Sequence, residues 1–259
     1  MIYAGCDLGT ISAKAVIIEN GNILAVEILP YKNLPKQAAI QVMEMAKKEA
    51  GLTKDPIAYC LSTGFGKKAV SFADKDIPEF ICLSRAVHKL NPEIRTVIDA
   101  GGSTIRAFNM DSSGKVTSSA TNEKCAAGTG KFMEVMAQAL EMPIEELSAA
   151  ALESGQALPI TSQCGVFAES EVITHVNEGK DRLDIFAGIS LSVAGKVAAV
   201  ARRISLDQPI VIVGGLAKNP IVVRDIEKEL GISFAEYNLD PRAVAAYGAA
   251  LVAEERHAG

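Results

Sequence analysis

The sequence contains no tryptophan, and its aromatic residues amount to only 5% of 259 residues. Apolar residues nevertheless make up 49% of the chain, which is enough for one or two hydrophobic cores. Alanine, valine, isoleucine and glycine are abundant, and small residues allow helices to lie close to sheets. The composition therefore favours an α/β fold.

No block of five like charges occurs, and 26 basic against 31 acidic residues leave a net charge of -5. A nucleic-acid-binding protein normally needs a basic patch, so nucleic acid is not an expected partner. The N-terminus, MIYAGCDLGT, has no basic segment of the signal-peptide kind. The longest near-apolar run, residues 243–253, is shorter than the roughly 20 residues that span a bilayer. We expect a cytoplasmic protein without a membrane partner.

The five cysteines form no Cys-x-x-Cys pair, which argues against a disulfide framework and against a self-contained zinc finger. Cys6, Cys60 and Cys82 lie in apolar segments, and we expect them in the core. Cys125 and Cys164 lie in glycine-containing, polar segments, each before a segment with a helical pattern. A thiolate near a helix N-terminus has a lowered pKa and is a good metal ligand.

Two cysteines cannot complete a tetrahedral zinc site or a four-iron cluster, because both usually need four ligands. A symmetric homodimer would supply two ligands from each chain. The alternative is that Cys125 and Cys164 are small core residues like the other three.

A nine-residue motif occurs twice. From Asp7 the sequence reads D-L-G-T-I-S-A-K-A, and from Asp99, 92 residues later, it reads D-A-G-G-S-T-I-R-A. Both copies fit D-x-G-x-x-[ST]-x-[KR]-A and follow an apolar, strand-like segment, which predicts two similar lobes. We place lobe I at residues 1–94 with the C-terminal helix 243–259, and lobe II, with Cys125 and Cys164, at residues 95–242.

Helical patterns alternate with strand-like segments along the chain, which predicts mixed sheets flanked by helices. The predicted helices cover residues 36–50, 131–141, 144–152, 166–177, 185–204 and 241–256.

The glycine turns of the two motifs suit a phosphate chain, because backbone N–H groups can approach an anion where no Cβ intervenes. For either turn alone, an ordinary hairpin is the alternative. The predicted nucleotide-binding residues are Gly9, Thr10, Ile11, Ser12 and Lys14 in the first motif, Gly101, Gly102, Ser103 and Thr104 in the second, Gly128 and Gly130 after Cys125, and Gly214, Gly215 and Leu216 for the adenosine.

Asp7 and Asp99 are the predicted catalytic residues, facing each other across a cleft between the lobes. Carboxylates in such positions hold Mg²⁺ through its waters or orient an attacking water. Lys14 and Arg106 occupy equivalent positions in the two motifs. They lie either near the phosphates or on a solvated strand face.

Three segments, GCDLGTISAKAVI, VIDAGGSTIRAF and VIVGGLAKNP, resemble the two phosphate motifs and the adenosine motif of the superfamily of acetate and sugar kinases, Hsp70 and actin. The resemblance covers nearly the whole chain. It implies two ribonuclease-H-like lobes of the actin-like ATPase kind, with ATP in the cleft and a hinge between them. It does not indicate what the ATP is used for, because this fold has many functions.

Within that fold, NEKCAAGTGKFMEVM and TSQCGVFAESEV resemble the activators of 2-hydroxyacyl-CoA dehydratases and the ATPase subunits of benzoyl-CoA reductase, the BadF/BadG/BcrA/BcrD type. The resemblance implies a homodimer in which Cys125 and Cys164 of both chains share one [4Fe-4S] cluster. It further implies an electron from ferredoxin or flavodoxin, delivered with ATP binding and hydrolysis to an iron-sulfur dehydratase or reductase. Members often carry Gln-Asp where this chain has Ser103 and Thr104.

Two other functions fit the same fold. One is a small-molecule, sugar-type kinase in which Asp99 is the base for a substrate hydroxyl. The other is a non-enzymatic module that uses nucleotide only to change shape. Neither needs Cys125 and Cys164, so brown colour after purification without oxygen would distinguish the activator from both.

Overall fold

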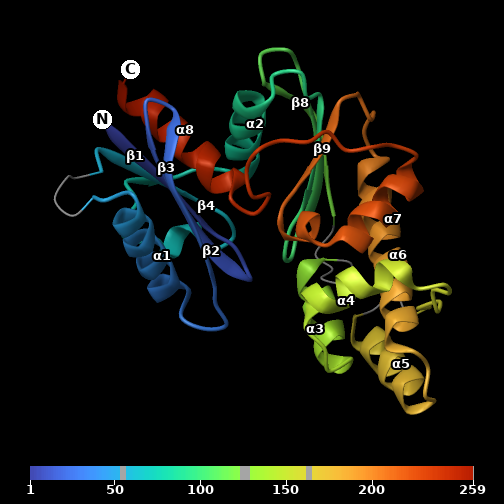
Figure 1. The fold of residues 1–259 in the computed structure, drawn as a ribbon. Helices are drawn as coiled ribbons and strands as arrows, with labels where there is room; N and C mark the ends of the chain where they lie inside the picture. The colour runs from blue at the N-terminus through green and yellow to red at the C-terminus, as the bar shows by residue number, and fades with distance from the viewer. Residues whose placement is uncertain (53–56, 123–128, 162–164, 259) are drawn as a thin grey trace. The chain divides into compact units, whose positions relative to one another are not determined.

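The structure is a computed structural model that describes residues 1–52, 57–122, 129–161 and 165–258 (Figure 1). The chain forms two compact units. Unit 1 comprises residues 1–94, 110–116 and 236–259, and unit 2 comprises residues 95–109 and 117–235. Each unit contains a mixed sheet with helices around it, so the predicted α/β fold with two ribonuclease-H-like lobes is confirmed.

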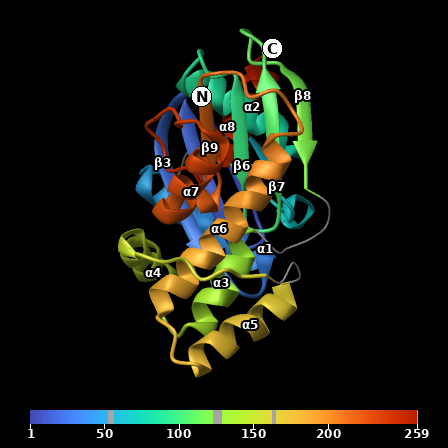
Figure 2. The same cartoon turned by 90° about the vertical axis from the view of Figure 1, so that its right-hand side faces the viewer.

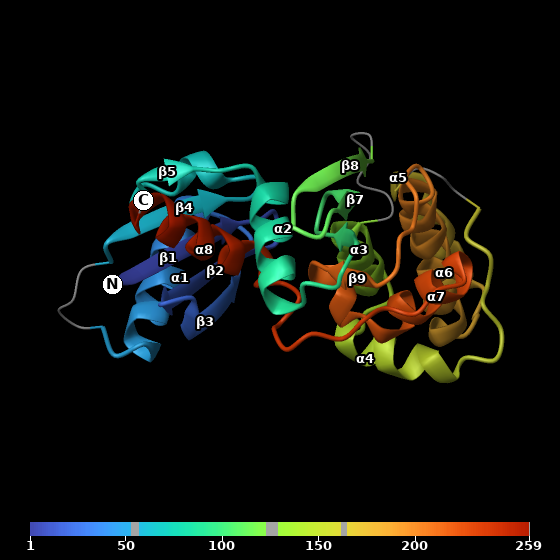
Figure 3. The ribbon, with the colours of Figure 1, turned by 90° about the horizontal axis from the view of Figure 1, so that it is seen from above.

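The sheet of unit 1 has the strand order β3-β2-β1-β4-β5, which can be followed in Figure 3. β1 pairs antiparallel with β2 and parallel with β4, so the sheet is mixed at its centre. The strands are β1 (Ile2–Leu8), β2 (Ser12–Glu19), β3 (Asn22–Pro30), β4 (Tyr59–Thr63) and β5 (Lys75–Asp76).

Helices cover both faces of this sheet (Figure 1). Ala4, Cys6 and Leu8 share a core with α1 (Pro35–Glu49), whereas the intervening Gly5 faces α8 (Val244–Ala258). Because successive strand residues point to opposite faces, β1 is buried on both sides. The apolar run at residues 243–253 is thereby explained as a core helix. Unit 1 also contains α2 (Glu79–Leu90) and the short helix η1 (Lys67–Ala69).

The sheet of unit 2 has the order β8-β7-β6-β9 and repeats the central pattern of unit 1. β6 pairs antiparallel with β7 and parallel with β9. Figures 1 and 2 show α3, α4 and α5 gathered beyond one end of this sheet. The elements are β6 (Thr96–Ala100), β7 (Ile105–Met110), β8 (Val116–Thr121), α3 (Gly130–Ala139), α4 (Ile144–Ala150), η2 (Ala151–Glu153), α5 (Gly165–Asn177), α6 (Arg182–Ala201), β9 (Ile210–Val213), η3 (Gly215–Lys218) and α7 (Pro220–Leu230).

α6 is long and apolar enough to cross a membrane by length and composition, with 20 residues. The sequence analysis did not single out this segment, because Gly188, Ser190 and Lys196 interrupt its apolar run. Of its most apolar window, 61% is buried inside the protein. These are the properties of a core helix. In unit 2, the α6 side chains of Ile185 and Ile189 are fully buried.

Candidate functional site

The two sequence motifs have the same local geometry. Each begins on the last residues of a central strand and turns directly into the antiparallel neighbour. In the first turn the Gly9 N–H donates to the carbonyl of Ser12 at 3.1 Å, and in the second the Gly101 N–H donates to the carbonyl of Thr104 at 2.9 Å. These four residues occupy equivalent positions in the repeat, so the repeat in sequence is also a repeat in structure.

Each motif aspartate is paired with the cation of its own motif. Asp7 lies opposite Lys14 across β1 and β2, and its Oδ2 is 2.9 Å from Lys14 Nζ. Asp99 lies opposite Arg106 across β6 and β7, and its Oδ2 is 3.3 Å from Arg106 Nη1. The aspartates are only 4% and 6% exposed. Both cations therefore balance a buried carboxylate, a role that the sequence analysis did not consider.

The other carboxylate oxygen of Asp7 has a different environment. Asp7 Oδ1 is buried and accepts no hydrogen bond from any residue that the structure describes. A buried acceptor without a donor costs about 1–3 kcal/mol. A hydrated cation or an ordered water would supply the missing donor, so Asp7 fits the role of holding Mg²⁺ through its water shell.

Gly64, at the end of β4, lies directly against the Asp7 carboxylate. Its φ is +89°, and a Cβ added there would lie 2.2 Å from Asp7 Oδ1 and 2.7 Å from the Leu8 carbonyl oxygen. Only glycine tolerates both this backbone conformation and this contact. The sequence analysis did not assign Gly64 to the site, although the two glycines of STGFG at a strand end are a visible signal.

Replacing Gly64 with alanine is expected to lower the free energy of unfolding by about 2–4 kcal/mol, because strain and a clash combine. Gly51→Ala is the matched control, since Gly51 also has positive φ, +69°, but nothing lies within 4 Å of an added Cβ. Strain alone should cost that variant about 1 kcal/mol. Urea unfolding of both variants measures the difference. Equal losses would show that Gly64 does not crowd Asp7.

The second turn is attached to the start of α3. The Gly130 N–H donates to the Gly101 carbonyl at 3.0 Å, and the Lys131 N–H donates to the Gly102 carbonyl at 2.8 Å. Amides of a first helical turn have no partner within their helix, so these two bonds satisfy two of them. The turn at residues 101–104 and the N-terminus of α3 consequently form one hydrogen-bonded piece.

The end of β9 also lies close to Asp99. Gly214 has a φ of +91°, and a Cβ there would be 2.6 Å from the Ala100 carbonyl oxygen and 3.0 Å from Asp99 Oδ1. Gly215 has nothing within 4 Å of an added Cβ. Leu216 is 2% exposed and belongs to the core of unit 2, so its side chain does not line an open surface.

The predicted core cysteines are confirmed as buried residues: Cys6, Cys60 and Cys82 are free thiols with little or no exposure. Burial raises the pKa of Cys60 and of Cys82 to about 12 and that of Cys6 well above its ordinary value. Such thiols are poor ligands and poor nucleophiles near neutral pH.

Three predicted site residues, Cys125, Gly128 and Cys164, lie outside the described residues. The two helices that follow them are described: α3 begins at Gly130 and α5 at Gly165. At the start of α5, Val166 and Phe167 are each 68% exposed. They are two adjacent apolar side chains on the surface of unit 2.

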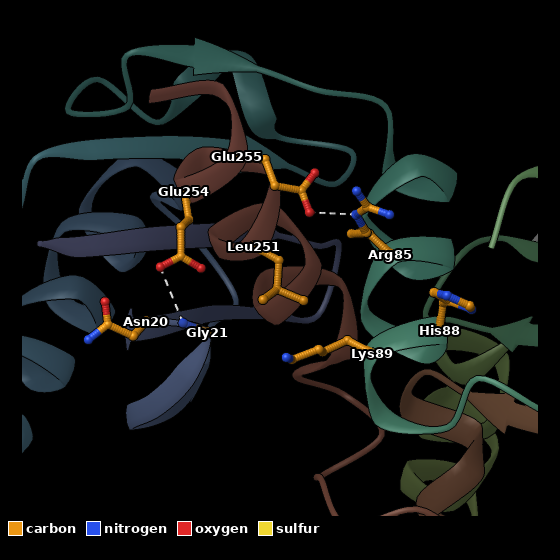
Figure 4. Close-up of a pocket in the computed structure, with 8 residues that line it drawn as sticks. All are labelled: Asn20, Gly21, Arg85, His88, Lys89, Leu251, Glu254 and Glu255. Carbon is orange, nitrogen blue, oxygen red and sulfur yellow. Dashed lines mark hydrogen bonds and ion pairs between the residues drawn. The ribbon is translucent and has the colours of Figure 1, made fainter. Parts of the chain in front are cut away.

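A separate cavity of about 230 Å³ lies in unit 1, between α2, α8 and the turn after β2 (Figure 4). Arg85 Nε is 2.6 Å from Glu255 Oε1, and the Gly21 N–H donates to Glu254 at 3.2 Å, so both carboxylates in its lining have a partner. This turn adjoins the start of β1, and Asp7 is close to the end of that strand. The cavity is therefore distinct from the two glycine turns that are predicted to bind phosphate.

Two ribonuclease-H-like sheets, each with an aspartate and a glycine turn at the same strand end, define an ATPase of the actin-like class. Within this class, the chain belongs to the BadF/BadG/BcrA/BcrD ATPase family, whose model matches residues 4–253.

Three proteins are similar to this chain over nearly their whole length. The chain is 38% identical to the activator of lactoyl-CoA dehydratase of Anaerotignum propionicum over 98% of both proteins. Its structure matches that of the activator of 2-hydroxyisocaproyl-CoA dehydratase from Clostridium difficile with bound ADPNP, with a TM-score of 0.94, 37% identity and coverage of 100% and 96%. Component A of (R)-2-hydroxyglutaryl-CoA dehydratase from Acidaminococcus fermentans gives a TM-score of 0.93, with 33% identity and full coverage of both chains.

Proposed function

We propose that this protein is an ATP-driven activator that delivers a low-potential electron to an iron-sulfur partner enzyme. The observation that carries the proposal is the pair of bonds from Gly130 and Lys131 to Gly101 and Gly102. They connect a turn suited to phosphate with the helix that follows Cys125. A nucleotide held by the turn would therefore act on the start of α3, five residues after the candidate metal ligand Cys125.

The nucleotide site is assigned to the two repeated turns. The turns at residues 9–12 and 101–104 would receive the phosphates, through main-chain amides other than those of Gly9 and Gly101, which donate within the turns. Lys14 would contribute a positive charge within reach of Gly9. Gly214 and Gly215 would lie against the adenosine. Mg²⁺ would neutralise phosphate charge, and Asp7 would hold its water shell through the unpartnered Oδ1. Asp99, balanced by Arg106, would orient the attacking water.

The metal site is assigned to Cys125 and Cys164 of two identical subunits. Four thiolates complete the ligand set of a [4Fe-4S] cluster, which stores and releases one electron when bound. The exposed Val166 and Phe167 support a dimer, because they lie only two and three residues after Cys164 and a second copy would cover them. Helix N-termini near the thiolates would stabilise their negative charge.

The partners follow from the family. Relatives are named activators of 2-hydroxyacyl-CoA dehydratases, so a dehydratase or related reductase with an iron-sulfur site is the proposed acceptor. Ferredoxin or flavodoxin is the proposed electron donor. We place this exchange in the cytoplasm, where reduced donor, ATP and CoA esters occur together.

The test is the reduction potential of anaerobically purified protein, measured with ADP and then with ATP. ATP can shift a conformational equilibrium only through its different affinities for the two conformations. A tenfold difference corresponds to about 60 mV for a one-electron couple, and we expect a shift of at least that size. Equal potentials with both nucleotides would contradict the coupling. Colourless, monomeric protein would favour the kinase alternative.

A further inference from the structure

Tyr31 follows directly after β3 and donates two hydrogen bonds to the β1–β2 turn. Its backbone N–H donates to the Ile11 carbonyl at 3.0 Å, and its hydroxyl donates to the Gly9 carbonyl. Within the turn, the Gly9 N–H donates to Ser12. One residue, distant in sequence, therefore binds both ends of the segment 9–11.

The bond to Gly9 fixes the direction of the next amide. A peptide unit is planar and trans, so its C=O and the following N–H point to opposite sides. Because the Gly9 carbonyl points toward the Tyr31 hydroxyl, the Thr10 N–H points away from Tyr31. The bond to Ile11 has the same effect on the Ser12 N–H. Both amides are consequently directed to the side of the turn away from the tyrosine.

The surroundings of the Tyr31 hydroxyl keep it protonated, so that it can donate a hydrogen bond. Burial raises the pKa of Tyr31, Lys14 acts in the opposite direction, and Asp7 raises the pKa further. Lys14 Nζ would be 2.8 Å from a Cβ at Gly9, so the cation lies next to the residue whose carbonyl Tyr31 holds. Tyr31, Gly9 and Lys14 thus form one connected group around the turn.

We propose that Tyr31 is a positioning residue for phosphate binding, which holds the Gly9 carbonyl so that the Thr10 amide is directed at the nucleotide. The proposal rests on the nucleotide site assigned above. Tyr31 acts through the main chain and does not itself touch the nucleotide. Its loss should affect ligands with phosphates and leave phosphate-free ligands unchanged.

Tyr31→Phe removes the hydroxyl and retains the ring. We expect ATP and ADP to bind about three- to tenfold more weakly, the range that the loss of one hydrogen bond produces. Binding of adenosine should change by less than about twofold, because no phosphate is present. Isothermal titration measures all three ligands. Steady-state hydrolysis should show a higher KM for ATP with kcat within about twofold, the signature of lost uniform binding.

Tyr247→Phe is the matched control. The Tyr247 hydroxyl donates to the Gly21 carbonyl at 3.1 Å, so this variant loses the same kind of bond, in the turn at the other end of β2. Thermal unfolding should show similar shifts for the two variants, while ATP binding should fall only in Tyr31→Phe. Unchanged ATP binding in Tyr31→Phe, or an equal loss for adenosine, would overturn the role of Tyr31 and leave the assigned nucleotide site in place. Wild-type protein that binds no ATP would overturn the nucleotide site together with it.

Discussion

Cys125→Ser and Cys164→Ser proteins, purified without oxygen, are expected to be colourless and to contain almost no iron. The wild-type dimer should contain about four iron and four sulfide per two chains. Each single substitution removes two of the four thiolates at once, because both subunits carry it. Two remaining thiolates do not hold a four-iron cluster, so the loss should be nearly complete. Iron and acid-labile sulfide determination, together with the visible absorption spectrum, measure it.

Cys60→Ala is the matched control for these variants. Cys60 is 4% exposed, and burial raises its pKa to about 12, which makes it a core residue. The variant should keep the iron and the colour, with a modest loss of stability. Thermal unfolding checks that the serine variants are folded. If folded Cys125→Ser or Cys164→Ser retained its iron, the assignment of the ligands would be wrong.

The parts of the site that depend on local sequence could be predicted. The repeated motif gave the positions of Asp7 and Asp99, and the strand that follows each turn explains why Lys14 and Arg106 lie opposite them. All six predicted helices are present, with ends within three residues of the prediction. Helical spacing and glycine turns are encoded over short stretches, and a single sequence reveals them.

The parts that depend on tertiary contact could not be predicted. Gly64 is next to Asp7, and Tyr31 is next to Gly9, only because β4 and β3 flank the first two strands. Leu216 looked like part of a ligand surface, but its side chain lies in the core. The sequence analysis also assigned no helix at α2 or α7. In α2 the buried residues Cys82 and Leu83 are adjacent, which resembles a short apolar run rather than a helix face.

Asp7→Asn is expected to reduce kcat for ATP hydrolysis by about 10²–10³-fold, the usual loss when one preorganised electrostatic group is removed from an active site. Asparagine keeps the shape of the side chain but removes the charge that attracts hydrated Mg²⁺. More Mg²⁺ should therefore be needed for half-maximal activity. Binding of ATP itself should change little. The substitution weakens the attraction of Mg²⁺, but it also removes a negative charge that repels the phosphates. Steady-state hydrolysis at varied Mg²⁺, with ATP affinity measured by titration, separates these effects.

Asp76→Asn is the control that shares the chemistry but not the position. Asp76 Oδ2 is 2.8 Å from Lys67 Nζ in an ion pair more exposed than that of Asp7 and Lys14. Exposed pairs contribute about 0–1 kcal/mol, so this variant should hydrolyse ATP like the wild type. Asp7→Asn is also expected to lose stability, because Lys14 keeps its charge without the buried partner. A folded Asp7→Asn protein with wild-type kcat and Mg²⁺ dependence would exclude Asp7 from catalysis and leave the Asp7–Lys14 pair a purely structural role.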